Sequence, residues 1–440
     1  MFNVAACISF IILLQPQYID NMLTLSKNEG IGGTLKSSPD DFIVREITPK
    51  GVVLELDRRY ESGEIEEEKN DGKFTTFVLQ KREWDTIRAL REISKRSGRG
   101  KKSVSHAGTK DKISISVQLA SIYGASPEKI RGVHIKDISI NGAWRSDGVE
   151  LGSNLGNEFR IRVRDIENDS EAIKKILEEL NGISLNYFDR QRFGSVRMNN
   201  FKVGMHILRN EFKEAVISFL TDTEGEKNGE AVEARRELLE TMDFRKALEH
   251  FPKYLKPERS MLDYLSKYEN YANAIRKLPR SLSLIFVHSV EALIFNAALQ
   301  ERVAGEDFES SIMCGENFYG FPDIESLGES GKFPIGPLVG YETESRLISE
   351  YDSGVMEKIG LKAENFKITG MPELSMRGTL RPLIYRFKDF SYSVEGSDAI
   401  FEFSIPSGAY ATILINEFTK SGSLILDDVA PGLGLSKILD

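Results

Sequence analysis

The chain has 440 residues, which is more than a single hydrophobic core usually serves, so its length favours two domains. Its two cysteines exclude a disulfide-stapled fold and a cysteine-based zinc cluster, and they fit the reducing conditions of the cytoplasm. The net charge of −9 argues against a nucleic-acid partner unless positive charge clusters locally, and no run of about 18 apolar residues indicates a membrane-spanning helix.

Residues 1–30 are expected to form an extension before the first domain. The apolar run from Val4 to Leu14 has no basic residues before it and no clear cleavage pattern after it, which is unlike a signal peptide. We expect this extension to be disordered or to include a mis-assigned start, with Met22 as the alternative start. A signal peptide is the other interpretation, and mature protein in a membrane fraction would support it.

Strand and helix patterns alternate from Ile31 to about residue 211. In Ile113–Leu119 apolar residues alternate with polar ones, which predicts a strand buried on one face only. Apolar residues alternate with arginines in the same way at 159–164. The predicted strands are Phe74–Gln80, Ile113–Leu119 and Phe159–Val163, and the predicted helices contain Trp84–Leu90 and Ile173–Leu180.

The pattern becomes helical from about Phe212 to Val303, most clearly at Ala231–Phe251 and Ser281–Val303. Strand patterns return after Gly378. They are Leu383–Phe387, Ala399–Ile405 and Tyr410–Phe418, with a turn at Val394–Asp398. This order predicts an α+β fold in which one mixed domain is interrupted by an inserted domain, and a linear string of domains is the alternative.

Asp111 is the only acidic residue in a strongly basic segment. It lies in the turn Gly108–Lys112, and flanking cations should keep its carboxylate ionised, as a nucleophile requires. The seven basic residues of this segment could also neutralise several phosphates: Lys95, Arg96, Arg99, Lys101, Lys102, Lys110 and Lys112. The alternative is a turn aspartate that bonds its own backbone, with the lysines in solvent.

Aromatic and basic residues are interleaved in Asn186–Gly194, which reads Asn-Tyr-Phe-Asp-Arg-Gln-Arg-Phe-Gly. Aromatic rings offer stacking faces for bases, arginines offer phosphate partners, and an amide can read a base edge. The segment therefore favours RNA binding. The alternative places Phe188 and Phe193 in the core and the arginines on the surface.

Together these segments resemble the TruD family of tRNA pseudouridine synthases. Three blocks carry the resemblance in the family's order: Gly33–Glu46, His106–Lys112 followed by Gln118, and Asn186–Gly194. Later blocks extend it, at His288–Val303 with Phe295 and Asn296, at Arg377–Pro382, and at Pro406–Thr412. Two positions depart from the family pattern: Asp189 stands where glycine is usual, and Asn416 stands where arginine is frequent.

The resemblance implies a pseudouridine synthase catalytic domain with a mixed, mainly antiparallel sheet, interrupted by a largely helical α/β insertion domain. The expected parts are residues 31–211 and 376–440 for the catalytic domain and residues 212–375 for the insertion. It further implies that the protein isomerises a uridine of tRNA, usually at position 13, without a cofactor or a metal. A cytoplasmic monomer with tRNA as its partner is expected, with no membrane and no protein partner.

The resemblance also implies roles for single residues, with Asp111 as the nucleophile. Asn186 aligns with a residue that contacts the target nucleotide, and its alternative role is a turn cap. Phe42 and Tyr410 align with aromatic residues of the uracil pocket, where core packing is the alternative. The remaining expected site residues are Lys36, which would orient Asp111 or a phosphate, and Phe188 and Arg192, which would shape the pocket floor.

Three other functions remain open on the residues alone. A non-catalytic RNA-binding protein or RNA chaperone would keep the basic segment without needing Asp111. A glycosidase-like hydrolase would need two carboxylates that flank its substrate and a less basic surround. A nucleotide-dependent transferase is disfavoured because neither a Walker pattern nor a Gly-x-Gly-x-x-Gly motif after a strand is present.

Overall fold

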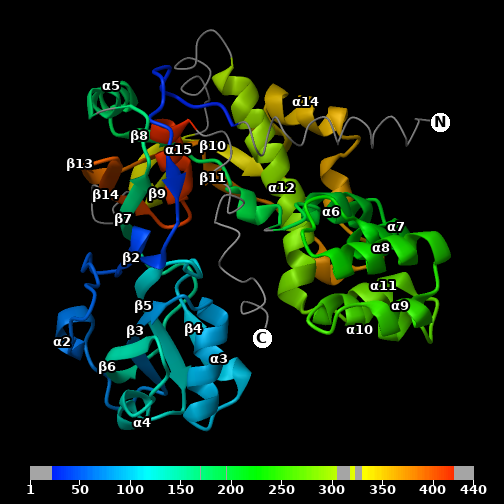
Figure 1. The fold of residues 1–440 in the computed structure, drawn as a ribbon, viewed down its shortest axis with the longest axis horizontal. Coiled ribbons are helices and arrows are strands. Elements are labelled where there is room, and N and C mark those ends of the chain that lie inside the picture. The colour runs from blue at the N-terminus through cyan, green and yellow to red at the C-terminus, as the bar shows by residue number, and fades with distance from the viewer. Residues whose placement is uncertain (1–21, 169, 195, 305–317, 323–329, 421–440) are drawn as a thin grey trace.

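The computed structural model describes residues 22–420 except 169, 195, 305–317 and 323–329. In Figure 1 the strands run down the left of the view, from β13 and β14 to β6, and a group of helices from α6 to α11 lies on the right. The long helix α12 (Arg280–Val303) runs between the two regions. The predicted extension is described only from Met22 onward, because residues 1–21 lie outside the described part of the chain.

The main sheet joins segments from both ends of the chain. Its strand order is β13-β14-β7-β2-β5-β3-β6, with β1 paired to β7 and β4 paired to β5. Only the β2–β5 pair is parallel among these pairings, so the sheet is mixed and mainly antiparallel, and the predicted α+β class is confirmed. The strands are β1 (Thr34–Leu35), β2 (Phe42–Ile47), β3 (Phe74–Arg82), β4 (Val104–His106), β5 (Ile115–Tyr123), β6 (Ile138–Ser146), β7 (Gly156–Arg164), β13 (Lys388–Glu395) and β14 (Asp398–Pro406).

Two smaller sheets link the main sheet to the helical region. Strand β8 (Ile183–Leu185) pairs with β12 (Ile384–Arg386), and β10 (Ser330–Leu338) pairs with both β9 (Phe318–Pro322) and β11 (Thr379–Pro382). The β10–β11 pair therefore crosses the predicted end of the insertion at residue 375. The predicted domain limits stay predictions.

The helices form two groups, one that packs on the main sheet and one that forms the helical region. The first group packs on the sheet and consists of α2 (Ser62–Ile65), α3 (Thr86–Arg96), α4 (Pro127–Arg131), α5 (Ser170–Leu180) and α15 (Ala411–Thr419). The second group consists of α6 (Asn200–Leu208), α7 (Phe212–Thr221), α8 (Gly229–Thr241), α9 (Phe244–His250), α10 (Lys256–Leu265), α11 (Tyr271–Ile275) and α14 (Glu350–Lys358). Within it α6 and α14 pack on α12, α7 packs on α6, and the remaining helices pack on α7 and on one another. The helical stretch predicted at Ala231–Phe251 is divided because Met242 takes a left-handed φ of 51° and Asp243 caps α9.

By length and composition, α12 is apolar enough to cross a membrane, although none was expected from the sequence. However, 78% of its most apolar stretch is buried inside the protein. Its side chains pack into the largest core cluster, where they contact residues of α6, α7 and α14. It is therefore a core helix of this fold, in keeping with its all-round apolar surface.

The strand predicted at Tyr410–Phe418 is wrong, because these residues form helix α15. All nine residues of α15 are buried, so no polar face marks a helical period in the sequence. Its β-branched and aromatic residues, such as Ile413, Ile415 and Phe418, are also those typical of strands. A short helix buried on every side cannot be told from a buried strand by its pattern.

The prediction that Ile113–Leu119 is half-buried is also wrong. Strand β5 lies between β2 and β3, and its side chains enter separate cores on the two faces of the sheet. Ala120 and Ile122 pack with α3 on one face, whereas Val117 and Leu119 pack with Trp144 on the other. The polar residues between them, Ser116 and Gln118, are fully buried as well. The small side chain of Ser116 allows this face of the strand to be covered closely, which the polarity of the residues does not reveal.

Candidate active site

Asp111 lies in the loop that connects β4 to β5, and its backbone is fixed from two sides. Its carbonyl oxygen accepts hydrogen bonds from Lys81 Nζ at 2.8 Å and from Ser114 Oγ at 2.7 Å. The carbonyl oxygen of the preceding residue, Lys110, accepts a hydrogen bond from the hydroxyl of Thr86 in the first turn of α3. The side chain of Asp111 is 27% exposed. The loop thus presents one carboxylate to solvent from a rigid support.

Two side chains from distant segments hold the carboxylate of Asp111. Lys36 Nζ donates to Oδ2 at 2.8 Å, and Gln191 Nε2 donates to Oδ1 at 3.1 Å. Lys36 follows β1, and Gln191 belongs to the aromatic and basic segment 186–194. The three blocks that were singled out in the sequence therefore meet at one carboxylate.

Burial and nearby cations act in opposite directions on Asp111. Burial by itself raises the pKa of this carboxyl group, but the charge and hydrogen bond of Lys36, the amide of Gln191 and the charge of Lys81 outweigh it. The net effect lowers the pKa of Asp111 below its usual value. Asp111 is consequently ionised at neutral pH, which is the state that a nucleophile or a base requires.

Lys81 is a buried cation that the sequence did not single out. It is fully buried in β3, and its ammonium donates to the carbonyl oxygens of Lys110 and Asp111 at 3.4 and 2.8 Å. Burial lowers the pKa of Lys81 to about 8, although the charge of Asp111 acts to raise it. Its position between Gln80 and Arg82, at the polar end of the strand, gave no sign of this role, because only the fold brings it beneath the loop.

The cations that hold Asp111 ionised are not those that flank it in the sequence. Lys110 is buried and pairs with Glu46 Oε2 at 2.6 Å, on the other side of the loop. Glu46 also accepts the backbone amide of Leu119, so this pair ties β2 to β5. For Lys110, the expectation that a neighbouring lysine stabilises the carboxylate is wrong. Lys36 and Lys81 do so instead.

Phe42 lies in the core below Lys36. Its ring is 2% exposed and meets Phe159 edge-on, with centroids 5.8 Å apart. The ammonium of Lys36 lies 4.2 Å from the centroid of the Phe42 ring, so a cation covers the face nearest to Asp111. In this structure Phe42 serves as a platform for Lys36.

Asn186 and Phe188 are organised by Arg381, another residue that the sequence did not single out. The guanidinium of Arg381 donates to Asn186 Oδ1 at 2.6 Å and to its carbonyl oxygen at 3.0 Å. It also lies 4.1 Å from the centroid of the Phe188 ring. Burial lowers the pKa of Arg381 to about 10. Arg381 lies in the Arg377–Pro382 block, but an arginine at the end of a short strand carries no local signal.

Phe188 lies between two arginines rather than at an open pocket wall. Arg192 lies on it as well, 5.1 Å from the ring centroid, and the ring of Tyr410 meets it at 6.2 Å. Phe188 is only 5% exposed. The expected site residues thus form two groups, Lys36 and Phe42 beside Asp111, and Asn186, Phe188, Arg192 and Tyr410 around Arg381. Gln191, which bonds Asp111, connects the groups, and Tyr410 and Arg192 lie closer to solvent than Phe42 and Phe188.

Comparison with known proteins identifies the family. The family model of "tRNA pseudouridine synthase D (TruD)" matches residues 19–418. This chain belongs to the TruD family. A "Probable tRNA pseudouridine synthase D" of Methanosarcina mazei is 34% identical over 90% of this chain and 95% of the relative, and one of Thermococcus sibiricus is 32% identical over 92% and 99%.

A solved structure of a TruD protein has the same fold. The crystal structure of a tRNA pseudouridine synthase D from Methanosarcina mazei superposes with a TM-score of 0.69 at 31% sequence identity. The match covers 93% of this chain and 98% of the other. The activity of this chain is accordingly that of a pseudouridine synthase acting on tRNA.

Two positions depart from the TruD pattern, and the structure places both. Asp189 Oδ2 accepts the hydroxyl of Thr412 at 2.9 Å, and Oδ1 accepts the amide of Arg190 at 2.7 Å, so the side chain ties the segment 186–194 to α15. Burial raises the pKa of Asp189, and the charge of Asp111 raises it further. Asn416 is buried within α15. Among the described residues, no group of histidine, cysteine or acidic side chains is placed to hold a metal ion.

Proposed function

We propose that this TruD protein converts uridine 13 of tRNA to pseudouridine, with Asp111 as the nucleophile and without a cofactor. The observation that supports the proposal is the carboxylate of Asp111, which lies in the loop between β4 and β5 and accepts hydrogen bonds from Lys36 and Gln191. Isomerisation breaks the bond between uracil N1 and the ribose, turns the base, and forms a bond from C5. The proton leaves C5 and one is gained at N1, so no redox partner enters the balance.

Two chemical routes begin from the same carboxylate. In one, Asp111 attacks the ribose carbon and the uracil departs as an anion. In the other, Asp111 removes a ribose proton and a glycal forms as the base departs. Both need an unprotonated carboxylate, and both benefit from donors close to the departing base. Candidates for such donors are the ammonium of Lys36, the amide of Gln191 and the guanidinium of Arg192.

The proposed surroundings of the target base follow from the same geometry. Tyr410 and Arg192 are the more exposed members of the aromatic cluster, so they are the residues that a flipped uracil would meet first. Asn186 has its side-chain amide engaged by Arg381 and by the carbonyl of Pro382. We infer that Asn186 positions the pocket through these bonds, or exchanges one of them for the nucleotide when RNA binds.

The decisive experiment compares the wild-type chain with Asp111→Asn on unmodified tRNA transcripts, with no cofactor added. Pseudouridine formation should occur with the wild-type chain and fall below detection with the variant, because the substitution removes the nucleophile and almost no volume. Tight tRNA binding without pseudouridine formation by either chain would favour an RNA-binding protein, and activity of both chains would move the chemistry to another residue.

The target position is tested separately. Mapping of pseudouridines in tRNA from cells that lack this protein should show loss at position 13, the usual site of the family. An unchanged position 13 would reject this part of the proposal while leaving the chemistry in place. We also propose that the protein is a monomer in solution and that it is located in the cytoplasm.

A further inference from the structure

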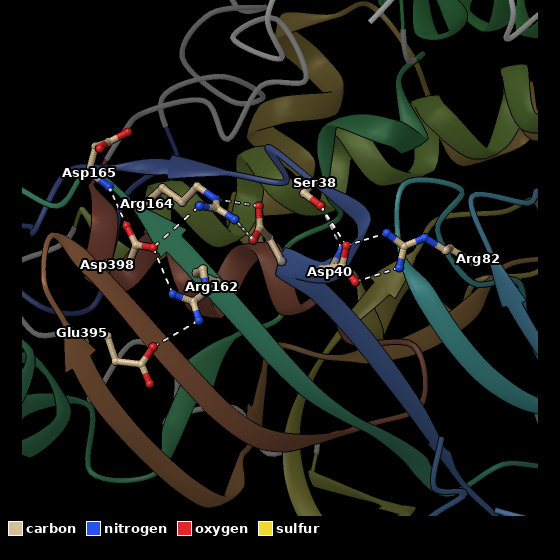
Figure 2. Close-up of polar contacts among 9 residues, drawn as sticks. Ser38, Asp40, Arg82, Arg162, Arg164, Asp165, Glu395 and Asp398 are labelled. Atoms are coloured by element: carbon tan, nitrogen blue, oxygen red, sulfur yellow. Dashed lines mark hydrogen bonds and ion pairs between the residues drawn. The ribbon is translucent and has the colours of Figure 1, made fainter. Parts of the chain in front are cut away.

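The protein has two surfaces rich in arginine and lysine, and they differ in whether their charge is already neutralised. The first is the outer face of β7, with Arg160, Arg162 and Arg164. Arg162 lies between Glu395 and Asp398 at 3.2 and 3.0 Å, as Figure 2 shows. The other two are paired in the same way: Arg164 with Asp41 at 2.7 Å and Arg160 with Glu402 at 3.2 Å. The arginines of β7 therefore form ion pairs within the protein, and little of their positive charge remains for binding RNA.

The second surface is a basic stripe along α3 and the turn that follows it, which consists of Arg88, Arg91, Lys95, Arg99, Lys101 and Lys102. All six side chains are exposed. On a helix of 3.6 residues per turn, Arg88, Arg91 and Lys95 point to one side. The opposite side carries the buried residues of α3, which are Thr86, Ala89, Leu90, Ile93 and Ser94. The stripe is thus a consequence of how α3 packs on the sheet.

Five of the six cations of this stripe, all except Arg88, are not neutralised as those of β7 are. Arg91, Lys95, Arg99, Lys101 and Lys102 form no ion pair with any residue that the structure describes. Residues 84–103 contain seven basic and two acidic side chains, a local net charge of +5 in a chain of net charge −9. Positive charge that the protein leaves unpaired is available to phosphates.

The stripe begins beside the active site. The hydroxyl of Thr86, in the first turn of α3, accepts the amide of Lys110 at 3.0 Å, so α3 starts directly under the Asp111 loop. Burial lowers the pKa of Lys112, and the charge of Arg88 lowers it further, which shows that the first cation of the stripe lies close to the residue after Asp111. Arg88 also lies on the ring of Trp84, 5.3 Å from its centroid.

The stripe ends at the far end of β5. Ser94 Oγ donates to the carbonyl of Gly100, which holds the turn after α3 against the helix. The guanidinium of Arg99 lies 3.2 to 3.4 Å from where a side chain on Gly124 would begin, just beyond the last residue of β5. From Arg88 to Lys95, within α3, the stripe spans about 10 Å at 1.5 Å per residue, and Arg99, Lys101 and Lys102 continue it beyond the end of the helix at Arg96. Its length therefore matches more than one phosphate of an RNA backbone.

We propose that the basic stripe on α3 binds the phosphate backbone of the tRNA substrate beyond the target uridine and so fixes the RNA on Asp111. This inference rests on the proposed function, because it takes tRNA as the substrate. Phosphate contacts of this kind position a nucleic acid without reading its sequence. They also make affinity depend steeply on salt, since each neutralised phosphate releases counterions.

The test is the salt dependence of tRNA binding, measured by fluorescence anisotropy on an unmodified transcript, in the Asp111→Asn background so that no turnover occurs. The double variant Arg91→Gln/Lys95→Gln should reduce the slope of log affinity against log salt by about 2, or about 1 for each lost contact. Its affinity should be roughly tenfold weaker at 0.1 M salt. Both replaced side chains are exposed, so the free energy of unfolding should change by less than about 0.5 kcal/mol.

The matched control is Lys174→Gln/Lys175→Gln on α5. It also removes two exposed charges from a helix of 11 residues, at the opposite end of the molecule (Figure 1). Its slope and affinity should equal those of the parent chain. Equal losses in the two double variants would show a general charge effect and overturn the inference, and so would an unchanged slope in the α3 variant.

The inference and the proposed function fail in different ways. Pseudouridine formation is measured in parallel on chains that retain Asp111. If these chains form pseudouridine but the α3 variant binds tRNA with the parent slope, the stripe is rejected and the function stands. If no chain forms pseudouridine but the α3 variant alone loses affinity and slope, the function is rejected and the stripe stands as an RNA surface.

Discussion

Asp111 owes its ionised state to two lysines that lie far from it in the sequence. Lys36 is 75 positions away and Lys81 is 30 positions away, and both reach the loop through the sheet. A half-buried carboxylate loses hydration, so its charged form persists only where cations or donors compensate. Lys110, which precedes Asp111 in the sequence, does not provide this compensation, because it is paired with Glu46.

Removing the charge of Lys36 should therefore move the pH dependence of activity. In Lys36→Met, burial still raises the pKa of Asp111 and less opposes it, so the carboxylate protonates at a higher pH than in the wild-type chain. We expect the acid limb of the pH profile of kcat to shift to higher pH, measured from initial rates of pseudouridine formation.

Lys36→Arg is the control for that experiment, since it keeps a positive charge beside Asp111. Its acid limb should lie close to that of the wild-type chain. A uniform loss of kcat at every pH in Lys36→Met, with the acid limb in place, would contradict the electrostatic role and leave Lys36 as an RNA contact.

The sequence identifies single site residues where several basic or aromatic residues lie close by in the chain. It does not identify residues whose contacts all come from distant segments. Asp111 and Gln191 stand out because basic and aromatic residues surround them. Lys81 and Arg381 do not, since each lies in a strand and has no aromatic residue or acid directly beside it in the sequence. Their roles depend on which backbone carbonyls and rings lie opposite them, and those come from other segments.

Helices α6 and α12 show how a single glycine sets the distance between two elements. A Cβ atom on Gly204 of α6 would lie 2.0 Å from the carbonyl oxygen of Phe286 in α12. The two helices can approach this closely only because residue 204 has no side chain. Since α12 also carries Asn296, which bonds the backbone of Phe188 in both directions, the packing of α12 extends to the candidate site.

Gly204→Ala should lower the free energy of unfolding by about 3 kcal/mol, because the backbone of α12 must move away. Urea unfolding measures this. The control is Gly354→Ala in α14, where a Cβ atom would meet nothing within 4 Å. That variant should gain about 0.5–1 kcal/mol, since alanine favours a helix over glycine. Similar effects of both substitutions would contradict the close contact.

Element type was predictable where one face of the element is polar and unpredictable where none is. Strand β7 alternates apolar residues with arginines, and its predicted position is confirmed. Helix α15 has no exposed face, so its predicted strand type is wrong. Strand β5 shows the converse error: its polar residues Ser116 and Gln118 suggested a solvent face, but α3 covers that face.

The first and last described segments of the chain are joined by hydrogen bonds. The carboxylate of Glu417, in α15, accepts the backbone amides of Leu25 and Ser26 at 2.9 and 3.1 Å. Lys420 Nζ donates back to the carbonyl of Ser26 at 2.7 Å. The main sheet makes the same connection, because β14 from the C-terminal part pairs with β7 from the N-terminal part.

Glu417→Ala should weaken this closure, because it leaves two backbone amides without their acceptor. We expect the free energy of unfolding to fall by about 3 kcal/mol. Hydrogen exchange should become faster at the amides of Leu25 and Ser26 than at the amides of β5. Glu178→Ala, at an exposed position of α5, should change stability by less than about 0.5 kcal/mol. Unchanged exchange at both amides in Glu417→Ala would contradict the proposed closure.

By itself the sequence determined the family, the α+β class and the identity of the candidate nucleophile. These follow from local patterns: three short blocks in a fixed order, alternation in strands such as β7, and one acid among many cations. The tertiary structure alone decided which cations serve Asp111, that the arginines of β7 are neutralised, and that Arg91 and Lys95 of α3 form no ion pair with a described residue. The reason is physical, since the energy of a charge depends on its burial and on its neighbours in space, and segments that are distant along the chain supply both.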